Sequence, residues 1–393
     1  MLIGVTKESF PGERRVALTP AVLPGLIQSG SKVVVQAGAG VEAGYTDEEY
    51  RQSGAEVIES RGEIFSSADI IVQVLALSAN PPAGLDDLGL MHPGQALISF
   101  LRPLAANENI VTLAKAQITG FAIELIPRIT RAQSMDALSS MSTVVGYKSV
   151  LAAAEALPKM FPMLMTAAGT IKPARIFVIG AGILGLQAIA TARRLGAVVK
   201  AYDVRPAVKQ EVESLGARFV ELPLDTGEDE KAGGYAHAKD ENFYRRQQEL
   251  LTGVVAESDV VISAAVIPGR KAPVLITEAM IKEMAPGSVI LDLAAEAGGN
   301  CSLSDAGDTV IRHGVTIMSP INIASTVPFH ASQMYGKNIS TFLRHLIKDG
   351  RLTLDRDDQI IAETLVTHGG EVVNQRIREF LQLPSKAPGK KST

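Results

Sequence analysis

The residues best suited to chemistry are three glycines near the middle of the chain. Gly180, Gly182 and Gly185 have the spacing Gly-x-Gly-x-x-Gly, and they follow an apolar run over Arg175–Ile179. This order predicts a strand, a tight turn and a helix whose first amide groups face an anion. In such a turn the first glycine permits the bend, the second lets the backbone approach a pyrophosphate, and the third lets the helix pack on the sheet. The pattern is typical of a dinucleotide-binding site.

An aspartate after the next apolar run indicates which dinucleotide to expect. Asp203 lies 18 residues after Gly185 and directly follows Val198–Tyr202. A carboxylate there accepts hydrogen bonds from the adenosine ribose and repels a 2′-phosphate. Arg205 argues the other way, because a nearby arginine is what a site for NADP would use. Asp203 is closer to the expected position, so the sequence favours NAD(H).

A second cluster of polar side chains lies between Pro127 and Ser140. It holds two arginines, one glutamine, three serines and one aspartate. Gln133 offers a donor and an acceptor without charge, which suits an amide such as that of nicotinamide. Asp136 and Ser139 are three residues apart and share one face of the helix that is expected to begin here. Ser134 or Asp136 would serve equally well as an N-cap, so a structural role stays open.

The candidate segments contain no obvious group for proton transfer. Dehydrogenases of hydroxy or amino acids need a general acid or base, usually His or Lys. The chain has six histidines, and none falls in these segments. A hydride passed between two nicotinamide rings needs no such group, because one carbon gives it and another receives it. Positioning and exclusion of water suffice. The pattern is therefore coherent with transfer between two nucleotides, and no cluster has metal-ligand spacing.

Two series of short apolar runs must position these residues. Each run is separated from the next by polar or helical stretches, which indicates parallel sheets covered by helices. The first series comprises Leu2–Val5, Lys32–Val35, Ile70–Val74, Leu97–Phe100 and Thr119–Ile123. The second begins at Arg175 and continues through Val198–Tyr202, Ala217–Val220, Val260–Ala264, Val289–Leu293 and Val315–Met318. We predict an α/β fold of two Rossmann-like, doubly wound parallel-sheet domains separated by a cleft.

Helical patterns enter and leave the second series. They run from about Ser134 to Ala156 and from Gln333 to Ile347, and a strand-like pair follows near Leu352–Leu354 and Gln359–Ala362. The arrangement suggests that the dinucleotide domain is inserted into an outer domain. The predicted divisions are an outer domain of residues 1–137 plus 328–383, an NAD(H)-binding domain of residues 138–327, and a disordered tail of residues 384–393.

A long acidic segment between Val220 and Val260 breaks the rhythm of the second series. Compact domains rarely carry such a loop without a use. Two interpretations stay open. The segment is either a solvated insertion or a lid hinged at Gly233-Gly234, which would bring Tyr235 over a bound cofactor.

Composition limits the class of protein. The 393 residues are 46% apolar and 20% charged with a net charge of −4, which predicts a globular protein and offers no charge-based case for nucleic acid. The one cysteine, Cys301, cannot form an internal disulfide, which fits a reducing compartment. Met1–Val5 runs straight into a charged segment, so no signal peptide is expected. The longest apolar stretch, Ile176–Ala192, has 17 residues and is explained by the glycine turn, so no membrane span is expected.

Further motifs recur in a fixed order along the chain. They are Lys7-Glu8 with Pro11–Ala17, Arg131–Asp136, Met165–Thr170, Tyr202–Arg205, Ala232–Ala236, Ile267–Pro273 and Asp292–Asn300. Over about residues 1–380 the chain resembles the NAD(H)-binding alpha subunit (domain I) of proton-translocating NAD(P) transhydrogenase. It is similar to the split-chain form, because no apolar span follows residue 380.

The resemblance implies a function and an assembly. It implies that the chain holds NAD(H) and exchanges hydride with NADP(H) bound on a beta subunit, while a membrane subunit couples the transfer to proton movement. It also implies a homodimer that binds no nucleic acid. Such a chain would be cytoplasmic and peripheral on the inner face of the membrane, held there through its partner subunits.

The resemblance also assigns roles to residues, motif by motif. Catalytic roles at the nicotinamide and its ribose fall to Arg128, Gln133, Asp136 and Ser139, with Ser134 and Met135 as further contacts. The pyrophosphate region is assigned Gly180, Gly182, Ile183 and Gly185, and the adenosine ribose Asp203, Val204 and Arg205. Gly234 and Tyr235 would form a mobile loop, and Val266 would line the adenine side.

Alanine dehydrogenase is similar in fold and shares the opening motif, including Arg15. The lysine and histidine of that family are not matched in Ile71–Val74 and Ser99–Pro103, and its second-domain aspartate is not matched in Glu296–Gly299. A soluble NAD-dependent alanine or amino-acid dehydrogenase is therefore the alternative. A non-catalytic NAD-sensing module is a third hypothesis.

Overall fold

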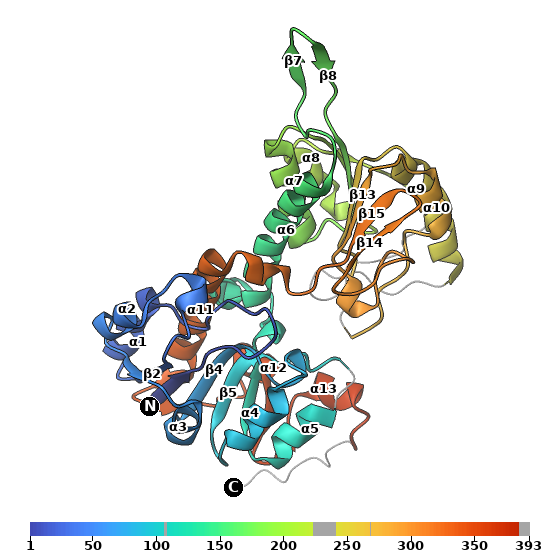
Figure 1. Cartoon of the computed structure of the whole chain (residues 1–393). Helices are drawn as coiled ribbons and strands as arrows, with labels where there is room; N and C mark the ends of the chain where they lie inside the picture. Colours follow the sequence, from blue (N-terminus) through green and yellow to red (C-terminus); the bar gives the residue numbers. More distant parts are fainter. Residues whose placement is uncertain (106–107, 223–240, 268, 385–393) are drawn as a thin grey trace. The chain divides into compact units, whose positions relative to one another are not determined.

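The computed structural model describes residues 1–105, 108–222, 241–267 and 269–384. The chain divides into two compact units, and Figure 1 shows the elements of each. Unit 1 consists of Met1–Met141 and Ser325–Thr393, and unit 2 of Ser142–Ala324. The first division falls inside helix α6 (Ala137–Ala156) and the second just before α11 (Pro328–Leu346). Both ends of the chain therefore contribute to unit 1. Apart from Pro384, the predicted tail lies outside the described residues.

The sheet of unit 1 has the strand order β19-β18-β6-β5-β4-β1-β2-β3 within the described ranges. Its strands are β1 (Leu2–Val5), β2 (Lys32–Gln36), β3 (Glu56–Ile58), β4 (Ile70–Leu75), β5 (Ala96–Phe100), β6 (Thr119–Ala122), β18 (Leu365–His368) and β19 (Glu371–Val372). The first six are parallel, and the last two form an antiparallel edge. The order is that of a doubly wound Rossmann sheet.

Buried apolar strands at the centre of this sheet explain why it carries helices on both faces. Every residue of β4 and β5 is buried, as expected for central parallel strands. On one face, side chains of α3 (Arg61–Ser67), α5 (Glu108–Lys115) and α13 (Gln375–Phe380) join a single apolar cluster. On the other face α11 packs, and its Phe342 meets Phe121 edge to face at 5.6 Å between ring centroids.

The sheet of unit 2 repeats this order with β11-β10-β9-β12-β13-β15-β14. Its strands are β9 (Arg175–Ile179), β10 (Val198–Tyr202), β11 (Arg218–Phe219), β12 (Val260–Ser263), β13 (Val289–Asp292), β14 (Thr309–Arg312) and β15 (Val315–Met318). All neighbours are parallel except β14, which pairs antiparallel with β15. The point where the winding reverses lies between β9 and β12, which is where such sheets bind ligands. The predicted fold class is confirmed.

The remaining helices are short. In unit 1 they are α1 (Leu23–Gln28), α2 (Asp47–Gln52), α4 (Gly84–Leu90) and α12 (Gln359–Thr364). In unit 2 they are α7 (Ile183–Arg194), α8 (Lys209–Ser214), α9 (Glu241–Ala256) and α10 (Glu278–Glu283). Figure 1 shows α6, α7 and α8 on one side of the second sheet and α9 and α10 on the other. No helix of the described residues is long and apolar enough to span a membrane.

Several local predictions were wrong or incomplete. The segment Gln359–Ala362 is helical, not strand-like, because Asp358 caps it and accepts a hydrogen bond from the Ile360 amide at 2.8 Å. Strands β3 and β14 were missed, since both are short edge strands with exposed or half-buried side chains. The hairpin of β7 (Leu164–Thr166) and β8 (Gly169–Ile171) was also missed, and Figure 1 shows it standing out from the rest of unit 2.

Candidate functional site

The glycine turn lies between β9 and α7, and its three glycines have different surroundings. Gly180 has a φ of +94°, and a Cβ built there would lie 3.1 Å from the carbonyl carbon of Ala264. At Gly185 a Cβ would lie 1.8 Å from the carbonyl oxygen of Gly180, so helix and turn can pack only without a side chain. A Cβ at Gly182 would meet nothing within 4 Å. The first and third glycines therefore shape the turn, while the second faces open space where a phosphate group could approach the backbone.

The N-terminus of α7 has no side-chain cap. Gly182 is its N-cap residue, and the helix runs for 12 residues from Ile183. The first amide groups of a helix have no acceptor within that helix, and the helix dipole favours an anion there. Ile183 is 38% exposed, as a residue at the mouth of such a turn must be. This end of α7 fits a pyrophosphate.

Asp203 is tied to the glycine turn by hydrogen bonds. Its Oδ2 accepts from the Ala181 amide at 2.8 Å, and its Oδ1 accepts from the Arg205 amide at 2.9 Å. The Arg205 side chain also donates to both carboxylate oxygens, at 2.9 and 3.0 Å. Arg205 therefore partly neutralises Asp203, which the spacing of the two residues did not predict. Val204, between them, is half-buried.

The loop after β12 is held by a buried asparagine that sequence reasoning missed. Asn300 is fully buried; its Oδ1 accepts from the Ser263 hydroxyl and the Ala265 amide, and its Nδ2 donates to the carbonyl oxygens of Ala265 and Pro273. All four hydrogen-bonding positions of the amide are used. Val266, which is 40% exposed, follows directly on this anchored backbone.

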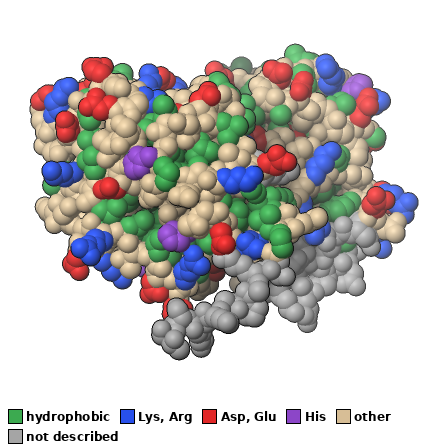
Figure 2. Space-filling view, turned by 90° about the horizontal axis from the view of Figure 1, so that it is seen from below, with side chains coloured by type: hydrophobic (Ala, Val, Ile, Leu, Met, Phe, Trp, Pro, Cys, Tyr) green, Lys and Arg blue, Asp and Glu red, His purple; other side chains and the backbone are tan. Residues whose placement is uncertain are grey.

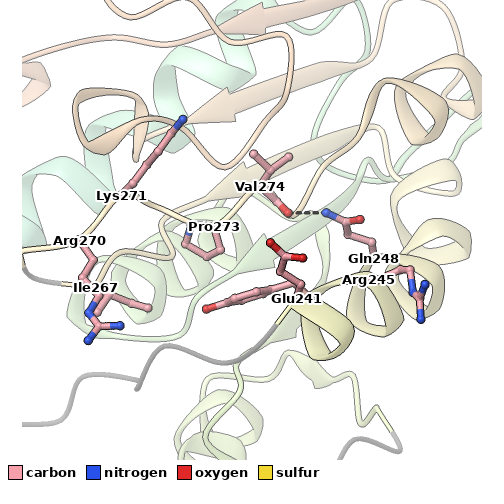
Figure 3. A pocket seen from close by; sticks show the side chains of 9 residues that line it. Glu241, Arg245, Gln248, Ile267, Arg270, Lys271, Pro273 and Val274 are labelled. Carbon is pink, nitrogen blue, oxygen red and sulfur yellow. Dashed lines mark hydrogen bonds between the residues drawn. The ribbon is translucent and has the colours of Figure 1, made fainter.

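A cavity of about 460 Å³ lies where this loop faces the start of α9 (Figure 3). Its described lining residues are Glu241, Tyr244, Arg245, Gln248, Ile267, Arg270, Lys271, Pro273 and Val274. Gln248 is already engaged, since its Nε2 donates to the carbonyl oxygen of Val274 at 2.6 Å. Ile267 is the neighbour of Val266, so the cavity opens beside the strand end where the adenine side was predicted.

The second polar cluster forms a 3₁₀ helix, η5 (Thr130–Met135), in unit 1. Gln133 and Ser134 are exposed, whereas Ala132 and Met135 are buried. Side chains three residues apart share a face in this helix type, so one face of η5 packs inward and the other carries Gln133 outward. Arg128, just before η5, is also exposed.

Asp136 and Ser139 come together at the start of α6. The Ser139 amide donates to Asp136 Oδ1 at 2.8 Å, and its hydroxyl donates to Oδ2 at 2.5 Å. This is the geometry of an N-cap, the structural role that the sequence left open. The cap places a carboxylate and a hydroxyl side by side, and both residues stay partly exposed.

The opening motif of unit 1 is engaged within the protein. The Arg15 guanidinium donates to Glu13 at 2.8 and 2.6 Å, and both side chains are buried. Gln73 donates to the Asp87 carboxylate at 3.0 Å. Arg15 is therefore compensated by an internal carboxylate, and the position equivalent to the missing lysine is tied to an acid.

Two further buried carboxylates cap strand ends in unit 1. Glu8 accepts from the amides of Val74 and Leu75 at 2.6 and 3.0 Å, where the pairing of β4 with β5 is irregular. Burial, helped by Glu13, raises the pKa of Glu8 to about 8. Glu124 accepts from the Arg102 amide at 2.6 Å, and burial raises its pKa to about 7. Neither carboxylate was predicted as a site residue.

Comparison with known proteins agrees with this geometry. Residues 4–145 match the family model described as alanine dehydrogenase/PNT, N-terminal domain, and residues 149–375 match the C-terminal domain of the same family. The chain is 44% identical over 377 residues to the first of the separate chains that make up NAD(P) transhydrogenase subunit alpha in Rhodospirillum rubrum, covering 95% of this chain and 98% of the relative. It belongs to the NAD(P) transhydrogenase alpha-subunit family. The resemblance inferred from the motifs is confirmed.

Solved structures support the family and its fold. The crystal structure of transhydrogenase from Sinorhizobium meliloti matches with a TM-score of 0.84 and 42% identity, covering 95% of this chain and 100% of that one. A structure of L-alanine dehydrogenase matches with a TM-score of 0.80 but only 26% identity, over 97% and 99% of the two chains. The family is of the NAD(H)-binding dehydrogenase type, and its members are oxidoreductases.

The structure brings the predicted residues together in two groups. Arg128, Gln133, Ser134, Met135, Asp136 and Ser139 lie on unit 1, and Gly180, Gly182, Ile183, Gly185, Asp203, Val204, Arg205 and Val266 lie on unit 2. Met135 is buried, so it supports η5 from within. The predicted mobile loop with Gly234 and Tyr235 lies outside the described residues.

Proposed function

We propose that this chain is the NAD(H)-binding subunit of a proton-translocating NAD(P) transhydrogenase. It passes hydride directly between NAD(H) held here and NADP(H) held on a partner subunit. The observation that carries the proposal is the contrast between an open dinucleotide turn at Gly182 and an engaged Arg15. An amino-acid dehydrogenase needs a free cation for the substrate carboxylate and an acid or base for its proton. Here Arg15 is paired with Glu13, and Gln73 stands beside Asp87.

Unit 2, within the predicted domain of residues 138–327, holds the adenosine and pyrophosphate end in this proposal. The amide groups at the start of α7 receive the pyrophosphate, and Gly182 keeps the approach free of side chains. Asp203 receives the ribose hydroxyls, and Arg205 has to share or release that carboxylate when the ribose arrives. Val266 lines the adenine side, next to the cavity at Ile267.

Unit 1, the predicted outer domain, supplies the polar groups for the nicotinamide end. The bound dinucleotide supplies the carbon that gives or receives hydride. Gln133 orients the ring through its carboxamide, and Arg128 and the Asp136–Ser139 pair hold the adjoining ribose. None of these groups has to exchange a proton, so their contribution is orientation and exclusion of water.

The proposed assembly includes a homodimer, an NADP(H)-binding beta subunit and a membrane subunit. The β7–β8 hairpin supports self-association, because it carries exposed Met165 (80%) and Ile171 (41%) away from the core of unit 2. The chain would then lie in the cytoplasm, on the inner membrane face, through its partners. Nucleic acid is not a proposed partner. On the face shown in Figure 2, basic and acidic side chains are interspersed in small groups.

The test uses purified chain with and without the co-expressed NADP(H)-binding subunit. The chain alone should bind NADH, seen by quenching or enhancement of its fluorescence, and should not oxidise L-alanine with NAD⁺. Adding the partner loaded with NADP⁺ should produce NADPH at the expense of NADH. Oxidation of L-alanine by the chain alone would support the dehydrogenase alternative, and absence of hydride exchange with the partner would overturn the proposal.

A further inference from the structure

The exposed segment η5 is attached to two elements much later in the chain. Both terminal nitrogens of Arg131 donate to the two oxygens of Asp358, each at 2.9 Å, across 227 residues of sequence. The side-chain amide of Asn338 donates to the carbonyl oxygen of Ser134 at 2.9 Å, across 204 residues. Gln133 lies between these two attachment points.

Asp358 is itself rigidly placed. Its Oδ1 accepts the Ile360 amide as the N-cap of α12, and its Oδ2 lies 3.1 Å from His345 Nε2 on α11. The side chain is 16% exposed, and its hydrogen bond with Arg131 is the main reason that its pKa falls to about 2. Single-contact surface ion pairs contribute little, but a two-pronged arginine–carboxylate pair also defines orientation.

The inner face of η5 depends on the same orientation. Ala132 is fully buried and Met135 is 6% exposed, so rotation of the segment would expose apolar surface. A turn of η5 about its axis would move Gln133 and the following Asp136 together. The polar attachments and the buried face thus select one presentation of the outward groups.

We propose that Asp358 and Asn338 are positioning residues that hold η5 so that Gln133 meets the nicotinamide carboxamide. Neither residue touches the cofactor in this proposal, and both act through η5. The inference rests on the proposed function, because it assigns the purpose of the clamp to hydride transfer. We define the clamp as Arg131, Asp358, Asn338 and the Ser134 carbonyl group.

The first experiment compares Asp358→Asn, Arg131→Met and the double variant with wild type. Asparagine keeps an N-cap for α12 but loses the two-pronged pair. We expect NADH affinity within about twofold of wild type and hydride transfer to the NADP(H)-binding partner slower by about tenfold, since misplacing a reacting group costs rate more than binding. The double variant should be no slower than either single variant, because both remove one interaction. Glu48→Gln, which alters an exposed ion pair with Arg51 in the same unit, should leave both quantities unchanged.

The second experiment reads the clamp without any assay of activity. Amide hydrogen exchange in residues 130–136 should be at least tenfold faster in Asp358→Asn and in Arg131→Met than in wild type, while the strands of unit 1 keep their protection. Arg131→Met also serves if Asp358→Asn does not fold. Unchanged exchange and unchanged transfer would overturn the inference, and so would equal losses of NADH affinity and transfer. If wild type shows no transfer at all, the proposed function fails, while the exchange result still decides whether the clamp exists.

Discussion

The turn between β9 and α7 and the segment η5 are both proposed to hold the same cofactor, yet they are built differently. Every atom that shapes the turn comes from a short stretch around Gly180–Gly185 and the neighbouring strand ends. The orientation of η5 depends instead on Asn338 and Asp358, more than 200 residues away. The turn excludes side chains, whereas η5 is placed by them. Backbone-encoded sites can be recognised from spacing, and sites placed by side chains cannot.

The two regions should also fail differently. A substitution in the turn should affect binding and folding together, because no other backbone path is available there. A substitution at η5 should spare binding and slow the transfer, because the segment keeps its fold while its side chains lose their aim. The following predictions test this contrast, beginning with the largest effect.

Gly185→Ala should break the turn. The new Cβ would lie 1.8 Å from the Gly180 carbonyl oxygen, so the start of α7 must shift. We expect NADH affinity to fall on the order of 100-fold and the free energy of unfolding to fall by about 3 kcal/mol. Titration with NADH and urea unfolding measure the two quantities. Gly253→Ala in α9 is the matched control, since its Cβ meets nothing within 4 Å and should stabilise by about 0.5–1 kcal/mol.

Gln133→Asn should show the opposite pattern. The substitution keeps the amide but withdraws it by one methylene, so NADH affinity should change by about twofold or less. Hydride transfer should slow by on the order of 10- to 100-fold, because the ring loses its orientation. Single-turnover rates with the NADP(H)-binding partner measure this. A large loss of NADH affinity with a normal rate of transfer would mean that Gln133 only binds.

Asp203→Ala should weaken NADH binding by about 1–3 kcal/mol, the cost of losing charge-assisted hydrogen bonds. The same change releases Arg205 from its carboxylate partner, so NADPH should bind relatively better than to wild type. Titration of both nucleotides measures the ratio of their affinities. An unchanged ratio would show that Asp203 does not set the preference for NAD(H).

Glu8→Gln should have the smallest effect, confined to the pH dependence of stability. Folded Glu8 keeps its proton up to a pKa of about 8, whereas the unfolded chain releases it near 4.5. The unfolded state therefore binds fewer protons in between, and the free energy of unfolding falls as pH rises through this window. The contribution is about 1 kcal/mol between pH 6 and pH 7. Urea unfolding at both values should show a shallower fall for Glu8→Gln, while Glu48→Gln keeps the slope of wild type.

Much of the fold was accessible from local pattern. The strand β10 has the bounds predicted for it, and β15 does too. The helix α12 was missed although Asp358, a good N-cap residue, directly precedes it. The apolar pair at the start of α12 resembles a strand and masks that capping signal. The β7–β8 hairpin offered no alternating pattern, since its strands have three residues each.

The candidate site divides in the same way. Asn300 ends one of the recurring motifs, but its four hydrogen bonds to the loop after β12 follow from strand order, not from spacing. In the sequence, Gln73 stands out only as a missing lysine. Its hydrogen bond to Asp87, across 14 residues, shows what replaced the lysine.

By itself, the sequence determined the dinucleotide turn, the acid that favours NAD(H), and the family, because these depend on backbone conformation and on neighbours along the chain. Only the tertiary structure decided that Arg205 is bound to Asp203, that Arg15 is compensated, and that Asp358 and Asn338 hold η5. The physical reason is that a charged or amide side chain reaches several ångströms and has several possible partners. Packing of the elements selects among those partners, and no spacing along the chain encodes that selection.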